Sequence, residues 1–330
     1  MKKEYILVTG SAGFIGFSLT KELLRQGHNV VGIDNFNDYY LPLLKEKRNS
    51  VLEEYPNFIC RRVFLDNYEQ MEKVFREFNF SLVCNLAAQA GVRRSMEEPF
   101  VYEKSNMAGF LTILELVRHY HIPRLVFASS ASVYGGNRKI PFSETDNVDT
   151  PISLYAATKK SNELMAHSYT HLFNFQSICL RLFSAYGPWG RPDMALWLFT
   201  ESILSGKPID VYNYGNMRRD FTYIDDIVRG IIAALFSKNL DKYEIFNLGN
   251  YRSEQLLDMI SIIERELGIM AVKNMMPMQP GDIPESFADI EKAKAKLNYT
   301  PVTTIAKGIP EFISWYKSYP EIADAIAKSR

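Results

Sequence analysis

Cysteine and histidine are scarce in this 330-residue chain, and their scarcity argues against several kinds of site. The three cysteines, Cys60, Cys84 and Cys179, each lie inside or beside an apolar run that is typical of a strand. We expect them to be reduced core residues of a cytoplasmic protein, with no metal or nucleophile role. Of the five histidines, His167 and His171 stand four residues apart on a predicted helix, but no glutamate follows His167 as it would in a metalloprotease. We therefore expect no metal site.

The chain also lacks an excess of either charge and any long hydrophobic run. Lysine plus arginine and aspartate plus glutamate each total 38, so the formal net charge is zero. This balance argues against a protein that binds nucleic acid or another polyanion. No apolar run approaches the roughly 18–20 residues that a membrane span needs. A strand is predicted almost at once, from Tyr5, so we expect no signal peptide and a cytoplasmic location.

The first residues carry the pattern of a dinucleotide-binding turn. A buried strand is predicted at Tyr5–Val8 and a helix at Phe14–Gln26, with Gly10, Gly13 and Gly16 around the turn between them. The first glycine permits a sharp turn, the second lets backbone N–H groups approach a pyrophosphate, and the third lets helix and strand pack closely. The N-terminal N–H groups of the helix then face the phosphates. The residues predicted to hold the dinucleotide here are Gly10, Gly13, Phe14, Ile15 and Gly16.

An acidic residue at the end of the second predicted strand indicates which dinucleotide binds. That strand, Asn29–Ile33, runs into Asp34 and Asn35, and Asp34 stands eighteen residues after Gly16. A carboxylate at this place accepts hydrogen bonds from a ribose 2′-OH and repels a 2′-phosphate. The sequence therefore favours NAD over NADP as the cofactor.

Strands and helices alternate through the first half of the chain. The further predicted strands are Phe58–Phe64, Ser81–Leu86, Arg124–Ser129 and Phe175–Phe183, and the further helices are Tyr68–Phe78, Phe100–His121 and Leu154–Leu172. This alternation predicts an α/β protein with a Rossmann-like, doubly wound parallel sheet.

From Ser184 the pattern becomes irregular and rich in glycine, proline, tryptophan and methionine, which predicts a smaller substrate domain. Ile227–Phe236 and Ile245–Leu248 are expected to return to the large sheet, so the two domains are interleaved. We predict an NAD-binding domain over residues 1–183 and about 225–250, and the substrate domain over 184–224 and 251–330.

Polar residues follow several of the predicted strands, at the edge where ligands of open α/β sheets bind. Asp66 suits an acceptor at the adenine edge, or alternatively the N-cap of the next helix. Asn106 lies inside a predicted helix, where asparagine is unfavourable, so we expect it to hold backbone near the cofactor rather than face solvent. The residues predicted to meet the cofactor at these strand ends are Asp66, Asn67, Leu86, Ala87, Ala88, Gln89, Asn106 and Ser129.

Tyr155 and Lys159 form the second informative pattern. They stand four residues apart on a predicted helix and so share one face, which places the ammonium beside the phenol ring. A nearby positive charge favours the phenolate and lowers the pKa of the tyrosine. Ser130, at a strand end, is placed to share a substrate hydroxyl proton with Tyr155. A surface tyrosine on an amphipathic helix is the alternative, but the accompanying glycine turn and Asp34 favour catalysis.

Taken in order, the motifs GxxGxxG, LAAQAGV, SSASVYG and YAATK resemble the extended short-chain dehydrogenase/reductase family over nearly the whole chain. Within it the chain is similar to nucleotide-sugar 4-epimerases. Leu180–Ala195, Met278–Asp282 and Gln89–Arg93 are most similar to the UDP-glucuronate 4-epimerase branch. The resemblance implies a tightly bound NAD and conversion of UDP-glucuronate into UDP-galacturonate through a 4-keto intermediate.

The resemblance also implies a role for each catalytic residue. Tyr155 takes the proton of the sugar 4-hydroxyl while a hydride leaves C4 for the nicotinamide. The keto sugar then turns over and receives the hydride on its other face, so there is no net oxidation. Ser130 is the hydroxyl partner, and Lys159 also holds the nicotinamide ribose, so both Tyr155 and Lys159 are expected to meet the cofactor.

Residues for the nucleotide and the sugar follow from the same resemblance. Arg219 matches the arginine that binds the diphosphate, Arg191 lies in the sugar pocket, Tyr212 flanks uracil, and Asp282 accepts from a ribose hydroxyl. A 4-keto glucuronate is a β-keto acid that can lose carbon dioxide, so an epimerase must hold its carboxylate firmly with short hydroxyl donors. The predicted substrate-binding residues are Gln89, Val92, Arg93, Ser130, Ser132, Tyr155, Ser184, Arg191, Met194, Tyr212, Arg219 and Asp282.

Several departures from the branch leave the sugar open. Arg94 stands where a tyrosine is usual, Ser184 where a threonine is usual, and Leu182 replaces a common aromatic residue. A UDP-glucose or UDP-N-acetylglucosamine 4-epimerase and a UDP-glucuronate decarboxylase remain alternatives, as does, in another class, an NAD-sensing regulator. Dehydration is disfavoured because Ser130–Ser132 offers no pair of acids.

The two long predicted helices, Phe100–His121 and Leu154–Leu172, resemble the pair that dimers of the family pack into a four-helix bundle. Their apolar positions are equally able to face the sheet of their own chain. We expect a homodimer.

Overall fold

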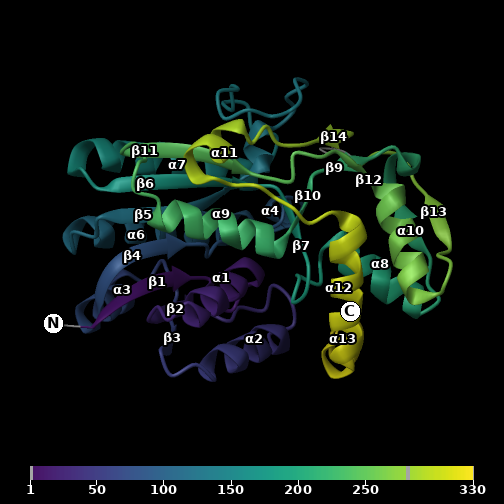
Figure 1. The fold of residues 1–330 in the computed structure, drawn as a ribbon, viewed down its shortest axis with the longest axis horizontal. Coiled ribbons are helices and arrows are strands. Elements are labelled where there is room, and N and C mark those ends of the chain that lie inside the picture. Colours follow the sequence, from purple (N-terminus) through teal and green to yellow (C-terminus); the bar gives the residue numbers. More distant parts are fainter. Residues whose placement is uncertain (1–2, 280–282, 330) are drawn as a thin grey trace.

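A seven-stranded, fully parallel sheet forms the centre of the computed structural model, which describes residues 3–279 and 283–329 (Figure 1). Its strand order is β11-β6-β5-β4-β1-β2-β3. The strands are β1 (Glu4–Thr9), β2 (Val30–Asp34), β3 (Phe58–Arg62), β4 (Asn79–Asn85), β5 (Arg124–Ser130), β6 (Gln176–Leu182) and β11 (Tyr243–Leu248). Nearly continuous apolar runs suit strands that are covered on both faces, and all five residues of β2 are buried.

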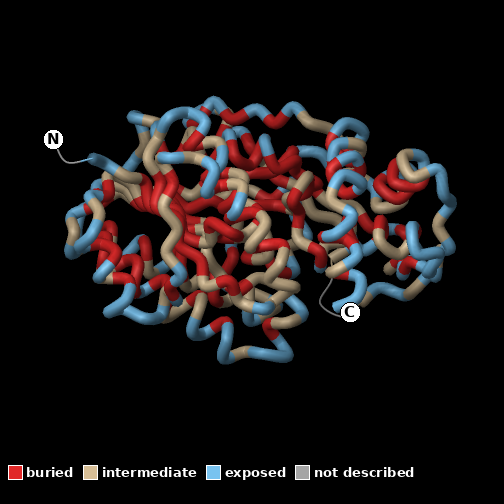
Figure 2. Tube along the Cα trace, turned by 90° about the horizontal axis from the view of Figure 1, so that it is seen from below, coloured by how far each residue is buried: buried red, intermediate tan, exposed pale blue. Residues whose placement is uncertain are grey.

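Helices cover both faces of the sheet, which confirms the doubly wound architecture. One face packs against α1 (Phe14–Arg25), α2 (Leu43–Glu53) and α9 (Ile224–Phe236), and the other against α3 (Tyr68–Glu77), α6 (Gly109–His119) and α7 (Leu154–Phe173). Each face has its own apolar core, and Figure 2 shows the buried segments running through the middle of the molecule with exposed segments around them.

The helix predicted at Phe100–His121 is interrupted, and α2 was not predicted. The chain forms α5 (Pro99–Tyr102), a π-helical turn at Glu103–Ala108, and then α6. The π turn brings Asn106 into the interior, where it is 2 % exposed. Single turns of this kind occur often at functional sites.

The remaining segments build three small sheets and further helices at the end of the large sheet to which its strands point (Figure 1). The small sheets pair β7 (Ser184–Tyr186) with β10 (Phe221–Tyr223), β9 (Arg218–Arg219) with both β12 (Glu254–Gln255) and β14 (Glu285–Ser286), and β8 (Ile209–Val211) with β13 (Lys273–Met275). The helices are α8 (Ala195–Leu204), α10 (Leu256–Leu267), α12 (Ile305–Ser318) and α13 (Pro320–Lys328).

The chain leaves the large sheet after β6 and returns to it later. β11 pairs with β6 along its whole length, from Tyr243 opposite Ser177 to Leu248 opposite Leu182. The short helix α11 (Glu291–Leu297) also packs against β11 and α9, although it lies in the part of the chain predicted for the substrate domain. The division into two domains stays a prediction.

Candidate active site

A cavity of about 580 Å³ opens where the carboxyl ends of the central strands meet the small sheets. Such a volume suits a small-molecule site. The predicted residues that line it are Gly10, Gly13, Phe14, Ile15, Gly16, Asp34, Asn35, Asp66, Leu86, Ala87, Ala88, Gln89, Val92, Ser129, Ser130, Ser132, Tyr155, Lys159, Ser184, Arg191 and Met194.

A few predicted residues lie outside that lining. Asn67 caps α3, its side chain accepting from Gln70 N, and so leaves the Asp66 carboxylate available to a ligand. Arg219 lies on β9. The Arg93 guanidinium stands 5.6 Å from the centre of the Tyr212 ring, and this contact joins the loop after β4 to the small sheets. Asn106 lies behind the cavity wall, and Asp282 lies outside the described residues.

The glycine turn is too tight for a side chain at its third glycine. A Cβ on Gly16 would stand 2.0 Å from the Gly10 carbonyl oxygen, and Gly10 itself has φ +72°. At the N-cap of α1, Gly13 provides no side-chain acceptor. The first N–H groups of the helix therefore have no side chain capping them, as a turn that binds phosphate requires.

Asp34 is held in place by the backbone around it. Its carboxylate accepts from Ala12 N at 3.1 Å and from Phe36 N at 2.9 Å, and the Lys45 ammonium stands 4.0 Å away. These contacts fix the Asp34 carboxyl group at the end of β2, in the cavity wall. A ribose hydroxyl is an acceptable neighbour for that carboxylate, whereas a phosphate is repelled.

Asn106 fixes the loop after β4. Its side chain accepts from Gln89 N at 2.8 Å and donates to Gln89 O at 3.0 Å and to the Thr158 hydroxyl at 3.0 Å. The Asn106 carbonyl, displaced by the π turn, accepts from Asn162 Nδ2 at 2.7 Å. The predicted backbone role of Asn106 matches this geometry, and the same residue joins the loop to α7.

Tyr155, Lys159 and Ser130 meet in the cavity wall. Burial raises the pKa of Tyr155, while a hydrogen bond with Ser130 and the charge of Arg191 lower it. Lys159, 4 % exposed, donates to the Ala128 carbonyl at 2.9 Å, and burial lowers its pKa to about 8. We expected Lys159 to lower the pKa of Tyr155, but within the protein itself the groups that do so are Ser130 and Arg191.

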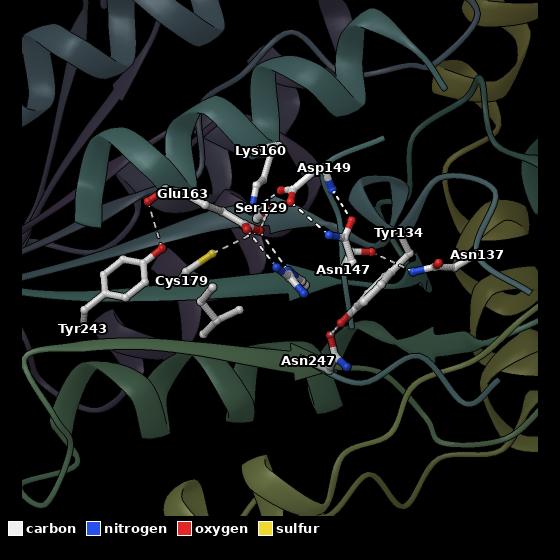
Figure 3. A network of polar contacts seen from close by, with 12 residues as sticks. Ser129, Tyr134, Asn137, Asn147, Asp149, Lys160, Glu163, Cys179, Tyr243 and Asn247 are labelled. Atoms are coloured by element: carbon white, nitrogen blue, oxygen red, sulfur yellow. Dashed lines mark hydrogen bonds and ion pairs between the residues drawn. The ribbon is translucent and has the colours of Figure 1, made fainter. Parts of the chain in front are cut away.

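A buried ion pair joins Glu163 and Arg181, and Figure 3 shows Glu163 beside Ser129 and Cys179. Glu163, one further turn along α7, accepts from Arg181 of β6 at 2.9 and 2.8 Å and from the Ser129 hydroxyl at 2.7 Å. Cys179 also approaches Glu163, with its sulfur 3.7 Å away, and burial raises the pKa of this thiol. The pair fixes α7 against β5 and β6, the three elements that carry the catalytic candidates or adjoin them. Cys84 is also fully buried, in agreement with a packing role.

Hydroxyl groups and one arginine mark the predicted sugar end of the cavity. Ser130 Oγ and Ser132 Oγ are 3.2 Å apart, and Ser184 lines the same space. Arg191 forms a bidentate ion pair with Asp193, at 3.0 and 2.5 Å, and Asp193 also accepts from the Tyr39 hydroxyl at 3.0 Å.

The departures noted in the sequence differ in their location. Leu182 and Ser184 line the cavity. Arg94 does not; it forms an ion pair with Glu98 at 2.8 Å, beside an adjoining cavity that also holds Asn67. The tyrosine-to-arginine change therefore leaves the charge of the sugar end to Arg191 and Asp193.

Sequence reasoning missed the contribution of the segment after β2. Asn37, Tyr39, Tyr40 and Lys45 all line the cavity. The aromatic pair Tyr39–Tyr40, shortly after the predicted ribose acid in the sequence, was the signal available.

Among the described residues no cluster of metal-ligating side chains is present, and no helix is both long and apolar enough to cross a membrane.

Comparisons with known proteins agree with this geometry. A family model described as "NAD dependent epimerase/dehydratase family" matches residues 6–249. A Staphylococcus aureus protein named CapI is 49% identical over 95% of this chain and 98% of its own. The UDP-glucuronate 4-epimerase 4 of Arabidopsis thaliana is 45% identical over 95% of this chain and 75% of its own. The UDP-glucuronic acid 4-epimerase of Bacillus cereus, solved in complex with UDP-glucuronic acid and NAD, has a TM-score of 0.90 at 35% identity and covers 95% of this chain and 99% of its own.

Proposed function

The chain belongs to the NAD dependent epimerase/dehydratase family, and from this premise we propose that it converts UDP-glucuronate into UDP-galacturonate. It is an NAD-dependent nucleotide-sugar 4-epimerase, an isomerase with no net oxidation. The observation that carries the choice of a uronate is the row of hydroxyls, Ser130, Ser132 and Ser184, that lines the same cavity as Tyr155.

The residues present fit NAD. The glycine turn is closed to side chains, α1 begins without a side-chain cap, and Asp34 is fixed where a ribose diol needs an acceptor. We propose that the strand-end residues Asp66, Ala87 and Gln89 and the catalytic Lys159 complete this site. When bound, NAD supplies the acceptor for the hydride of the sugar C4 and the donor that returns it to the opposite face.

Tyr155 acts as the base and then the acid of the reaction. Its phenolate oxygen takes the proton of the 4-hydroxyl as C4 becomes a ketone, and the resulting phenol returns the proton after the sugar has turned over. Ser130 hydrogen-bonds to Tyr155 and so favours the phenolate, and Arg191 favours it through its charge. Lys159 is fixed through the Ala128 carbonyl beside the predicted nicotinamide ribose.

The sugar must be held by its carboxylate, because a β-keto acid decarboxylates when the breaking bond aligns with the ketone. Ser132 and Ser184 each have one hydroxyl proton to donate to the carboxylate, whereas the proton of Ser130 serves Tyr155. Arg219, Tyr212 and Arg93 are proposed for the uridine diphosphate. Arg219 lies on β9, and Tyr212, which follows β8, is contacted by Arg93 from the loop after β4; this grouping supports a nucleotide end at the small sheets.

The whole chain divides this work between two parts. We propose that residues 1–183 and about 225–250 bind NAD and that residues 184–224 and 251–330 bind the nucleotide sugar. Exposed apolar side chains on and beside α6 and α7, Phe100, Leu111, Leu164 and Leu172, support a homodimer through a four-helix bundle. A cytoplasmic location stays a prediction.

Product analysis tests the proposal. The purified protein is offered UDP-glucuronate, UDP-glucose and UDP-N-acetylglucosamine separately, and products are identified by NMR. We expect UDP-galacturonate from the first substrate and no product from the other two. A pentose product would move the assignment to a decarboxylase, a product from a neutral sugar would move it to a hexose epimerase, and no product from any sugar would contradict it.

A further inference from the structure

Arg48, on α2, is a fully buried arginine that joins three separate segments of the cleft. Its guanidinium donates to Ala12 O at 3.0 Å, to the Tyr40 hydroxyl at 2.6 Å, to Trp189 O at 2.5 Å and to Gly190 O at 3.2 Å. The ion pairs found among the described residues include none with Arg48. The two terminal nitrogens of this buried cation thus donate to backbone and phenol oxygens, while its buried Nε has no hydrogen-bond partner. Such an arrangement is uncommon because burying a charge is costly.

The carbonyls that Arg48 holds belong to the two binding elements of the cavity. Ala12 lies inside the glycine turn, directly before Gly13. Trp189 and Gly190 lead directly into Arg191, the arginine of the sugar end. Trp189 has φ +62°, a backbone conformation that residues other than glycine seldom adopt. Its carbonyl is thus held in a particular direction, toward the guanidinium.

A second contact also connects the segment after β2 with the sugar end of the cavity. The Tyr39 hydroxyl donates to Asp193 at 3.0 Å, and Asp193 holds Arg191 by two hydrogen bonds. Tyr39 and Tyr40 lie in the segment between β2, which ends at Asp34, and α2. The sugar end is therefore tied to the dinucleotide end at two places, and Arg48 makes the buried one.

We propose that Arg48 is a positioning residue that couples the two sites: it holds the Trp189–Arg191 segment against the glycine turn, so that binding of NAD and binding of the UDP-sugar strengthen each other. Arg48 does not line the cavity itself. It acts through Ala12 on one side and Arg191 on the other. The inference rests on the proposed NAD and UDP-sugar sites. Coupling of this kind is reciprocal, so either ligand reports on it.

The experiment measures the Kd of NAD by equilibrium dialysis of the full-length protein after its bound NAD has been removed, with and without saturating UDP-glucuronate. Wild-type protein is compared with Arg48→Met, Arg48→Lys and the control Lys47→Met. Lys47 lies beside Arg48 on the same helix, but its side chain is 43% exposed. UDP-glucuronate carries the sugar, so it reaches the end of the cavity that Arg191 lines.

We expect UDP-glucuronate to tighten NAD binding about tenfold in the wild type and in Lys47→Met, and by a factor of about one in Arg48→Met. Arg48→Lys is the deciding variant if the methionine variant fails to fold. A lysine is a single point donor that cannot span these carbonyls, so it too is expected to lose most of the coupling. In turnover assays the KM for the UDP-sugar should rise about tenfold in Arg48→Lys while kcat changes less.

An arginine that merely stabilises the fold would lower the melting temperature and leave the ratio of the two NAD affinities unchanged. That result, tenfold coupling retained in a folded Arg48 variant, would overturn the inference alone. Absence of UDP-glucuronate binding by the wild-type protein would overturn the proposed function and this inference with it.

Discussion

At the scale of single residues, the Tyr155 hydroxyl is the atom on which turnover depends. Changing Tyr155→Phe removes the proton carrier and leaves the ring in place. We expect kcat to fall by roughly 10²–10⁴, the usual contribution of a general acid–base group. NAD should remain bound, because the phenol is only one of many groups around the cofactor. Turnover is measured by NMR and bound NAD by chromatography of the denatured protein; near-normal kcat would refute the acid–base role.

We expect the buried charge of Lys159 to lower the stability of the fold, although turnover requires this residue. Burial lowers its pKa to about 8, below the ordinary 10.5, so the unfolded chain holds a proton between these values that the folded protein lacks. Stability therefore rises as pH increases through this range, and the charged form costs the fold roughly 3 kcal/mol below pH 8. Lys159→Met should abolish turnover and raise the melting temperature of NAD-free protein at pH 7.

The pH dependence provides the check on this reasoning. Thermal unfolding of the wild type and of Lys159→Met at pH 7 and at pH 10 should give a difference that shrinks at the higher pH. A variant that is less stable at pH 7 would mean that the lost hydrogen bond to Ala128 outweighs the burial of the charge.

Residues whose role follows from spacing along one element could be found from the sequence. Tyr155 and Lys159 share a helix face, and Ser130 ends a strand, so their meeting in one cavity follows from regular geometry. Tyr39 and Arg48 escaped notice because their positions depend on the path of an irregular segment and on contacts across 141–154 positions of sequence. No local pattern encodes such contacts.

At the scale of elements, the Glu163–Arg181 ion pair fixes α7 against the sheet. Removing one partner, as in Glu163→Leu, leaves a buried unpaired guanidinium and should cost about 3–5 kcal/mol. Replacing both, as in Glu163→Leu with Arg181→Met, should restore most of the stability, because apolar side chains of similar size tolerate burial. We expect the double variant to fold and yet to show a kcat reduced at least about tenfold, since α7 and the Ser129 hydroxyl lose their common anchor.

Urea unfolding gives the stability of these variants and initial rates give kcat. A double variant with wild-type kcat would show that the ion pair serves stability alone.

The turn between β1 and α1 allows a sharper test of dinucleotide binding. Gly16→Ala places a Cβ 2.0 Å from the Gly10 carbonyl oxygen, so the backbone of the turn must move. We expect NAD affinity to fall about tenfold to hundredfold, corresponding to roughly 1–3 kcal/mol of overpacking. Gly136→Ala is the matched control, because a Cβ there meets nothing within 4 Å. Equal NAD binding by both variants would show that the turn does not hold the cofactor.

The strands of the large sheet were predictable because each is an apolar run of suitable length between turn residues. The helix α2 was missed because its sequence is polar and its buried residues include Lys45, Arg48 and Asn49. The π turn at Glu103–Ala108 was also missed. Within it, Asn106 makes hydrogen bonds to the loop after β4 and to Asn162 of α7, which no helical periodicity reveals.

At the scale of the whole molecule, the helices α6 and α7 present apolar side chains to the outside. Leu164 is 56% exposed and Leu111 is 41% exposed. We expect the wild-type protein to sediment as a dimer and the double variant Leu111→Glu with Leu164→Glu to sediment as a folded monomer. Met270→Glu, at an equally apolar site that is 75% exposed on another part of the surface, should leave the dimer intact. A wild-type monomer at micromolar concentration would refute the proposed assembly.

The return of the chain to the large sheet could be predicted from the sequence more readily than the small sheets could. The apolar run at Ile245–Leu248 has the character of a buried strand, and it became part of β11. The three small sheets consist of strands of two or three residues, such as Arg218–Arg219, which are too short to give a period. Their existence depends on what the rest of the fold places beside them.

The late arrival of β11 bears on how the protein is made. After β6 has been synthesised, α8, α9 and the intervening strands must still be synthesised before Tyr243–Leu248 emerges from the ribosome. Until then the growing chain exposes the edge of β6, six of whose seven residues are buried in the finished fold. Open apolar edges recruit other chains. The nascent polypeptide therefore has a long interval in which it depends on shielding by chaperones, and a stalled or truncated product ending before residue 243 is prone to aggregate.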